Sequence, residues 1–88
     1  MCYTVEEASL IDGMIQSYFA PRSVSEQVRL RYWETHCHLQ HEQVGRSDLL
    51  NIRDALTFLA PVFQGNRQTQ KEIWSIIAKT DALLSAAV

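Results

Sequence analysis

Three histidines and one of the two cysteines of this 88-residue chain lie in one stretch, residues 35–41, which reads Thr-His-Cys-His-Leu-Gln-His. Imidazole and thiol groups bind transition metals, transfer protons near neutral pH or act as nucleophiles. A metal-binding or catalytic site, if the chain has one, is therefore expected in this stretch. Whether its side chains can act together depends on the secondary structure that positions them.

Helix-capping patterns predict where the helices begin and end. Ser or Thr followed three residues later by Glu, the capping-box pattern, occurs at three places: Thr4–Glu7, Ser23–Glu26 and Thr69–Glu72. A fourth start is expected at Ser47 or Asp48. Helix stops are expected at Ala20–Pro21, at Gly45 and at residues 64–66.

These signals predict helices at about residues 5–19, 24–43, 48–63 and 70–86. Pro61 should end the regular part of the third helix near Leu59, because proline lacks an amide proton and clashes with the preceding turn. Short connections favour antiparallel neighbours. We therefore expect an all-α fold, a small four-helix and largely antiparallel bundle, in which residues 1–88 form a single helical domain that homodimerisation can complete.

Composition and charge exclude several classes of protein. Hydrophobic residues make up 47% of the chain, which suits a globular core, but no apolar run approaches the ~20 residues that span a bilayer. Acidic residues follow the N-terminus, where a signal peptide would be basic and then apolar. Cys2 and Cys37 do not make a disulfide framework. We expect a cytoplasmic protein with no membrane partner and no cofactor.

The predicted helix at 24–43 is unusual because it carries two apolar stripes. Val28, Tyr32 and Leu39 form one stripe; Leu30, Trp33, Cys37 and Val44 form a second, roughly 160° away around the helix. A single amphipathic helix on a small monomer needs one stripe only. The second therefore predicts either a central helix or an exposed surface that meets another chain.

The same helical geometry separates the histidines. His36 falls on the side of Tyr32 and Leu39, whereas His38 lies on another face. Glu34, His38 and His41 share that face, where they are weak candidates for the ligands of a metal ion. Cys37 and His41, four residues apart, are candidates for a thiolate–imidazole pair. No histidine outside residues 36–41 supports either site.

We therefore expect a protein-binding regulator of the inhibitor, anti-activator or chaperone type, not an enzyme. Its partner is another protein, with a transcription regulator as one candidate, and a homodimer is expected. Aromatic and arginine side chains dominate such interfaces. The expected partner-binding residues are Leu30, Trp33, Cys37, Val44, Arg29, Phe58 and Trp74.

Two alternatives remain open at this stage. One is a metal- or redox-linked function at Cys37, His38 and His41. The other is a weak helix-turn-helix DNA binder built on the turn at residues 44–47, in which the following helix would expose only Asn51, Arg53, Asp54 and Thr57 to DNA. Nucleic acid is nevertheless a disfavoured partner, because the net charge is −2 and the basic residues are spread along the chain.

Overall fold

The computed structural model of the chain describes residues 3–19 and 25–86, and of Tyr18 and Phe19 the backbone only. Four α-helices dominate the described residues, and no strand occurs among them. The elements are α1 (Val5–Met14), a π-helical turn η1 (Ile15–Phe19), α2 (Glu26–Gln40), α3 (Arg46–Leu59), a 3₁₀ turn η2 (Ala60–Phe63) and α4 (Arg67–Ala86). The prediction of an all-α four-helix fold is confirmed.

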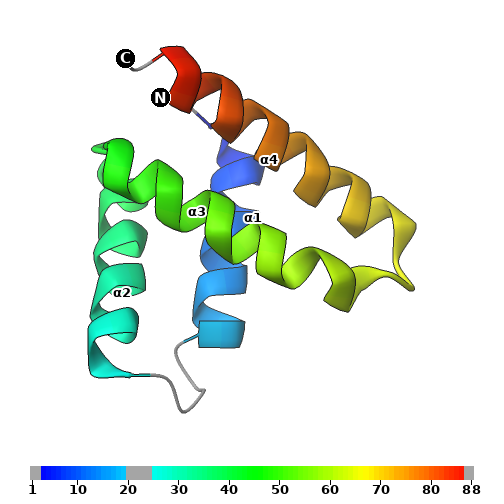
Figure 1. Ribbon diagram of the computed structural model, residues 1–88, viewed down its shortest axis with the longest axis horizontal. Helices are drawn as coiled ribbons and strands as arrows, with labels where there is room; N and C mark the ends of the chain where they lie inside the picture. The colour runs from blue at the N-terminus through cyan, green and yellow to red at the C-terminus, as the bar shows by residue number, and fades with distance from the viewer. Residues whose placement is uncertain (1–2, 20–24, 87–88) are drawn as a thin grey trace.

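The helices form two hairpins that cross each other (Figure 1). α1 and α2 run in opposite directions side by side, and α3 and α4 form a second antiparallel pair that lies steeply across them. The extents of the molecule are 34 × 31 × 21 Å. α3 packs on α4 within its own hairpin and on α2 of the other.

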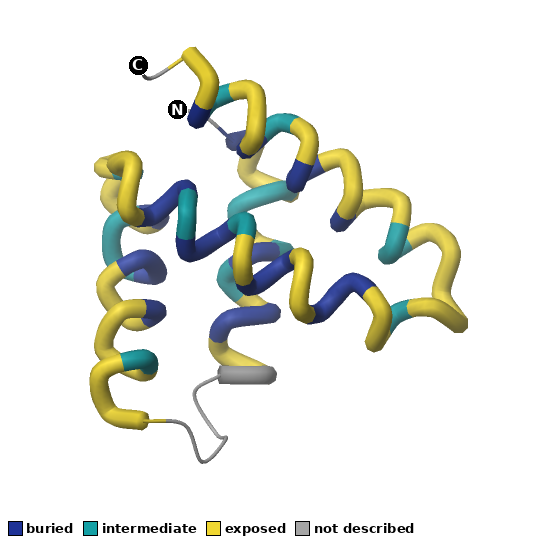
Figure 2. The backbone as a smooth tube through the Cα atoms, viewed as in Figure 1, coloured by how far each residue is buried: buried dark blue, intermediate teal, exposed yellow. Residues whose placement is uncertain are grey.

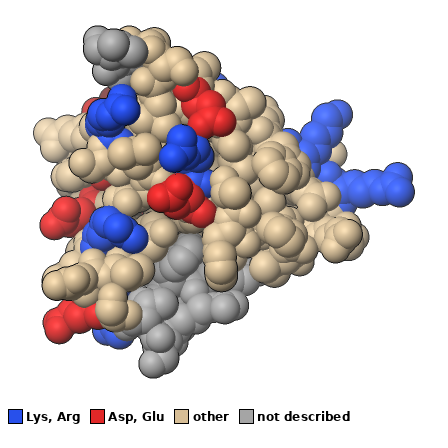
Figure 3. Space-filling model, in the orientation of Figure 1, with Lys and Arg blue, Asp and Glu red and all other residues tan. Residues whose placement is uncertain are grey.

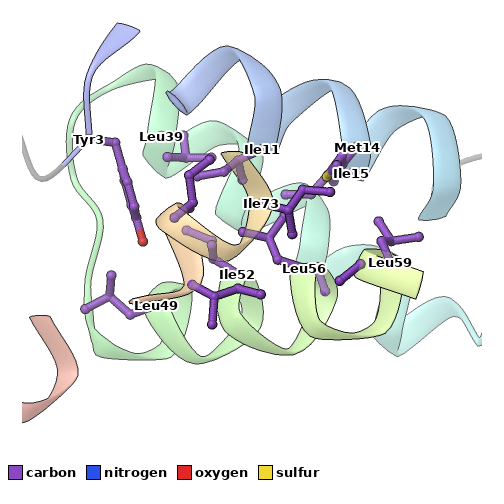
Figure 4. Close-up of a cluster of buried hydrophobic side chains, with 14 of the residues drawn as sticks. Tyr3, Ile11, Met14, Ile15, Leu39, Leu49, Ile52, Leu56, Leu59 and Ile73 are labelled. Carbon is purple, nitrogen blue, oxygen red and sulfur yellow. The ribbon is translucent and has the colours of Figure 1, made fainter. Parts of the chain in front are cut away.

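The core fills the space between the hairpins, and α3 and α4 contribute most of it (Figure 4). Apolar residues at helical spacing dictate this arrangement, because each helix can bury one face only by packing it on another. The most deeply buried aliphatic side chains are Ile11, Ile52, Leu56, Leu59, Ile73 and Ile76. None of the described helices is long and apolar enough to cross a membrane.

The first predicted capping box is confirmed. The Thr4 hydroxyl accepts a hydrogen bond from the Glu7 amide at 3.1 Å, and the Glu7 carboxylate accepts one from the Thr4 amide at 2.8 Å. The same carboxylate accepts from Lys79 Nζ at 2.6 Å, and Tyr3 Oη lies 2.6 Å from Thr80 Oγ1. These two contacts hold the start of α1 against α4.

The other predicted starts are displaced by a few residues. α2 begins at Glu26 with Ser25 as its cap, so Glu26 is the first residue of the helix and not the third; Ser23 lies outside the described residues. α4 begins at Arg67, where the Asn66 side chain accepts from the Thr69 amide at 3.1 Å. The predicted Thr69 start is wrong because asparagine provides an equally good cap one turn earlier.

Pro61 acts as predicted: α3 ends at Leu59, and the chain tightens into η2 over Ala60–Phe63. The predicted stop of the second helix at Gly45 is wrong. α2 ends after Gln40, with Glu42 in the left-handed region at φ 57° and Gln43 N donating to His38 O at 2.8 Å. This is a Schellman-type end, and Gly45 instead precedes α3 as its N-cap.

Glu42→Gly should stabilise the protein by about 0.5–1 kcal/mol, because glycine adopts the left-handed conformation without the steric cost of a Cβ atom. Chemical denaturation measures the change. Glu42→Ala is the control, since alanine keeps the Cβ atom and should give no gain. A Glu42→Gly protein no more stable than Glu42→Ala would contradict this account of the turn.

The hydrogen bond from Lys79, followed by the bond from the Thr4 amide, lowers the pKa of Glu7 below its ordinary 4.5. The stability that Glu7 contributes is therefore present above pH 4.5 and lost as the pH falls through the lowered pKa. Glu7→Gln should destabilise the protein at neutral pH, and the deficit should disappear in acid. Urea denaturation across pH measures this, with exposed Glu6→Gln as the control; a deficit that persists in acid would count against the Lys79 pair.

Candidate protein-interaction surface

The stretch at residues 35–41 forms the last turns of α2, and its side chains point to different neighbours. His36 turns to α1 and His38 to α3, while His41 caps the helix end and is exposed. Each buried or half-buried histidine meets an aspartate from a neighbouring helix. α2 is therefore held by two separate His–Asp pairs, one on each side.

The pair on the α3 side is centred on Asp48, a buried carboxylate in the first turn of α3. Its Oδ2 lies 2.7 Å from His38 Nδ1 and accepts from the Gly45 amide at 2.9 Å, and its Oδ1 accepts from Thr35 Oγ1 at 3.0 Å. Asn51 Nδ2 donates to the same threonine oxygen at 3.1 Å. Every polar group at this contact is thereby satisfied, as a buried carboxylate requires.

The predicted metal candidates are not brought together as three ligands. His38 Nδ1 is engaged by Asp48, Glu34 lies exposed on α2, and His41 lies at the helix end. Among the described residues, no group of three or more His, Cys, Asp or Glu side chains is arranged to hold a metal ion. Cys37 has a free thiol and is half-buried.

On the α1 side, His36 is buried and its Nδ1 is hydrogen-bonded to Asp12 Oδ1. Gln16 Nε2 lies 3.4 Å from the other oxygen of Asp12 and 3.5 Å from His36 Nδ1. The indole of Trp33 packs on the imidazole, with ring centroids 4.8 Å apart and planes tilted by 37°. Asp12 thus fixes His36, and His36 in turn supports Trp33.

Among the described residues, no helix packs on the outer face of α2, which is defined by Leu30, Trp33 and Cys37. α1 contacts α2 through His36, and α3 contacts it through Thr35 and His38, so neither neighbour covers this face. Leu30 and Trp33 are each 55% exposed. Figure 2 shows α2 at one edge of the molecule, buried on the side toward the bundle and exposed along much of the rest.

The remaining expected partner-binding residues lie elsewhere. Val44 is half-buried and packs against the core, whereas Arg29 is exposed beside Leu30. Phe58 is exposed two helical turns after Asn51, on the side of α3 that faces α2. Trp74 is exposed on α4, which packs along the other side of α3. The exposed aromatic residues thus occupy separate faces, and only Leu30 and Trp33 share one with Cys37.

Comparison of the chain with protein-family models, with curated proteins and with solved structures gives no match. The chemistry of its own residues is therefore the basis for assigning a function.

The structure removes one of the residues that the helix-turn-helix interpretation expects to contact DNA bases. Asn51 is buried and donates to Thr35, so it is not available to a DNA base; the expectation that it is exposed is wrong, because α2 covers this side of α3. The groove between the two helices is mixed in charge, since Glu34, Asp48 and Asp54 line it together with Arg31 and Arg46. On the face seen in Figure 3, Lys and Arg alternate with Asp and Glu on the left and centre, two basic side chains project alone at the right edge, and no continuous basic stripe joins them.

The aspartates that organise both sides of α2 were missed by the sequence analysis. Asp12 appears in the sequence as one polar residue in an amphipathic helix, and nothing near it indicates a histidine partner. Asp48 was noted as a helix start only. The available signal was that Asp48 follows Gly45 by three residues, where a carboxylate can accept from the capping residue's amide.

Asp48→Ala should cost about 2–4 kcal/mol, because it leaves the Thr35 hydroxyl and the Gly45 amide without their buried acceptor. Asp54→Ala, on the exposed side of the same helix, should change the free energy of unfolding by less than about 0.5 kcal/mol. Urea denaturation compares the two variants. Equal effects would show that Asp48 does not hold α2 on α3.

Proposed function

We propose that the chain is a small protein-binding regulator, of the inhibitor, anti-activator or chaperone type and not an enzyme, that binds its partner through the outer face of α2. One observation carries this proposal: Leu30 and Trp33 project one turn apart from a helix whose other sides already pack on α1 and α3. Apolar surface left exposed in this way gains free energy when a partner covers it.

The support of Trp33 favours binding over accidental exposure. Its ring is held against His36, and His36 is held by Asp12, so the indole is oriented before any partner arrives. A side chain ordered in advance loses less conformational entropy on binding, which strengthens an interface. Tryptophan in such a position is also the residue type most often found to dominate binding energy.

The shape and charge of this face indicate what it binds. A row of apolar side chains along a helix is complementary to a second amphipathic helix, whose own apolar residues recur every three or four positions. Arg29 and Glu34 flank the row and require an acidic and a basic residue, respectively, on the partner. We propose a protein helix of this composition as the ligand. A cytoplasmic location is part of the proposal, supported by the free thiol of Cys37.

A photoreactive phenylalanine at position 30 should cross-link to this partner in cells, and the same residue at position 74, on α4, should not. The cross-linked protein is identified by mass spectrometry, purified and titrated against the chain. Trp33→Ala should weaken binding by at least tenfold, which corresponds to about 1.4 kcal/mol or more for a buried tryptophan anchor.

Trp74→Ala is the matched control, since it removes an equally exposed indole from another helix and should leave the affinity unchanged. Circular dichroism verifies that both variants keep their helix content. Equal cross-linking from positions 30 and 74, or equal loss of affinity in the two variants, would refute the assignment of the site to α2.

A further inference from the structure

The outer face of α2 has the spacing of a coiled-coil seam. Leu30, Trp33 and Cys37 follow one another at intervals of three and four residues, as do the a and d positions of a heptad. Glu26 and Gln40, the next positions of the repeat on either side, are polar. The apolar part of the seam is therefore short and has defined ends.

Arg29 and Glu34 lie on the two edges of this seam, in the places that flank a and d in a heptad. They are five residues apart, and neither makes an ion pair with another residue in the part of the chain that the structure describes. In a parallel coiled coil, the residue directly before position a of one helix lies beside a residue of the second helix whose sequence number is five higher. Arg29 of one chain would therefore meet Glu34 of an identical chain.

Resting on the proposed function, we infer that α2 of a second copy of this chain, aligned in parallel, pairs with the same face, so that the dimer and the regulated protein compete for it. Each outer face supplies the apolar row and the opposite charges that the other requires, and the twofold symmetry forms two Arg29–Glu34 pairs at once. An antiparallel alignment would instead place Arg29 beside Arg29 and Glu34 beside Glu34. The charge pattern thus favours one orientation.

The described part of the fold leaves this alignment accessible. α1 and α3 are attached to α2 on the His36 side and the Thr35 side, and α2 lies at the edge of the molecule (Figures 1 and 2). Only three side chains per chain, Leu30, Trp33 and Cys37, form the apolar centre of this contact. An interface of this size belongs at the small end of specific associations, so the dimer exchanges with monomer as concentration changes.

Sedimentation velocity over a range of concentrations should show the average mass rising from one chain toward two. Trp33→Ala should weaken this association by at least tenfold while Trp74→Ala leaves it unchanged. Arg29→Glu or Glu34→Arg alone converts two attractive pairs into two repulsive ones and should weaken the dimer about tenfold. The double variant, which exchanges the two charges, should restore it.

Cys37 can test whether the two α2 helices are parallel. It occupies an a position, and the same a position of two parallel helices lies close enough for a disulfide. In a Cys2→Ser protein, the oxidant diamide should link Cys37 to Cys37 of the second copy, taking up the two electrons and two protons released by the thiols. A chain whose single cysteine is at position 74 measures the rate of random collision and should link far more slowly.

Three outcomes would overturn the inference. The chain could stay monomeric at all concentrations while its α2 face still binds the cross-linked partner. That result would rule out the second copy as an occupant of the face and leave the proposed function intact. A dimer that is indifferent to Trp33→Ala and to both charge variants uses another surface. If the dimer needs Trp33 but its Cys37 disulfide forms no faster than the disulfide of the position-74 control, the two helices are not parallel.

Discussion

The buried carboxylate of Asp48 is the interaction on which the position of α2 depends. It accepts hydrogen bonds from Thr35 and from the Gly45 amide and pairs with His38, so one side chain joins the start of α3, the turn before it and the end of α2. A buried carboxylate is costly unless such partners surround it. Because these partners are available in only one arrangement, the polar contact fixes the relation of α2 to α3 more specifically than apolar packing would.

The orientation of α2 follows from this constraint. With Thr35 and His38 turned to α3, the helical repeat directs His36 to α1, where it contacts Asp12. Leu30 and Trp33 are then left on the outside, with the half-buried Cys37 beside them. Their exposure is a geometric consequence of two polar contacts on neighbouring sides of one helix. A rotation of α2 that buried Trp33 would break both pairs, so the apolar face is kept in solvent by interactions elsewhere on the helix.

The sequence was sufficient for the features that depend on local physical chemistry. The Thr4–Glu7 cap and the end of α3 before Pro61 both follow from contacts within a turn or two of the residues concerned. The start of α4 was misplaced because Asn66 competes with Thr69 as a cap, and local propensity separates such neighbours poorly. The pairing of His36 with Asp12 and of His38 with Asp48 joins residues on different helices, which periodicity alone does not relate.

The two apolar stripes of α2 illustrate the same limit. Periodicity identified both stripes, but it treated Val44, Phe58 and Trp74 as parts of one partner surface. The structure places Val44 against the core and the two aromatic residues on other helices, on separate faces. An 88-residue chain has little interior volume relative to its surface, so some large apolar side chains remain outside whatever the fold. Exposure alone is therefore a weak sign of function, and Trp33 is singled out because the partly buried His36–Asp12 pair supports its ring.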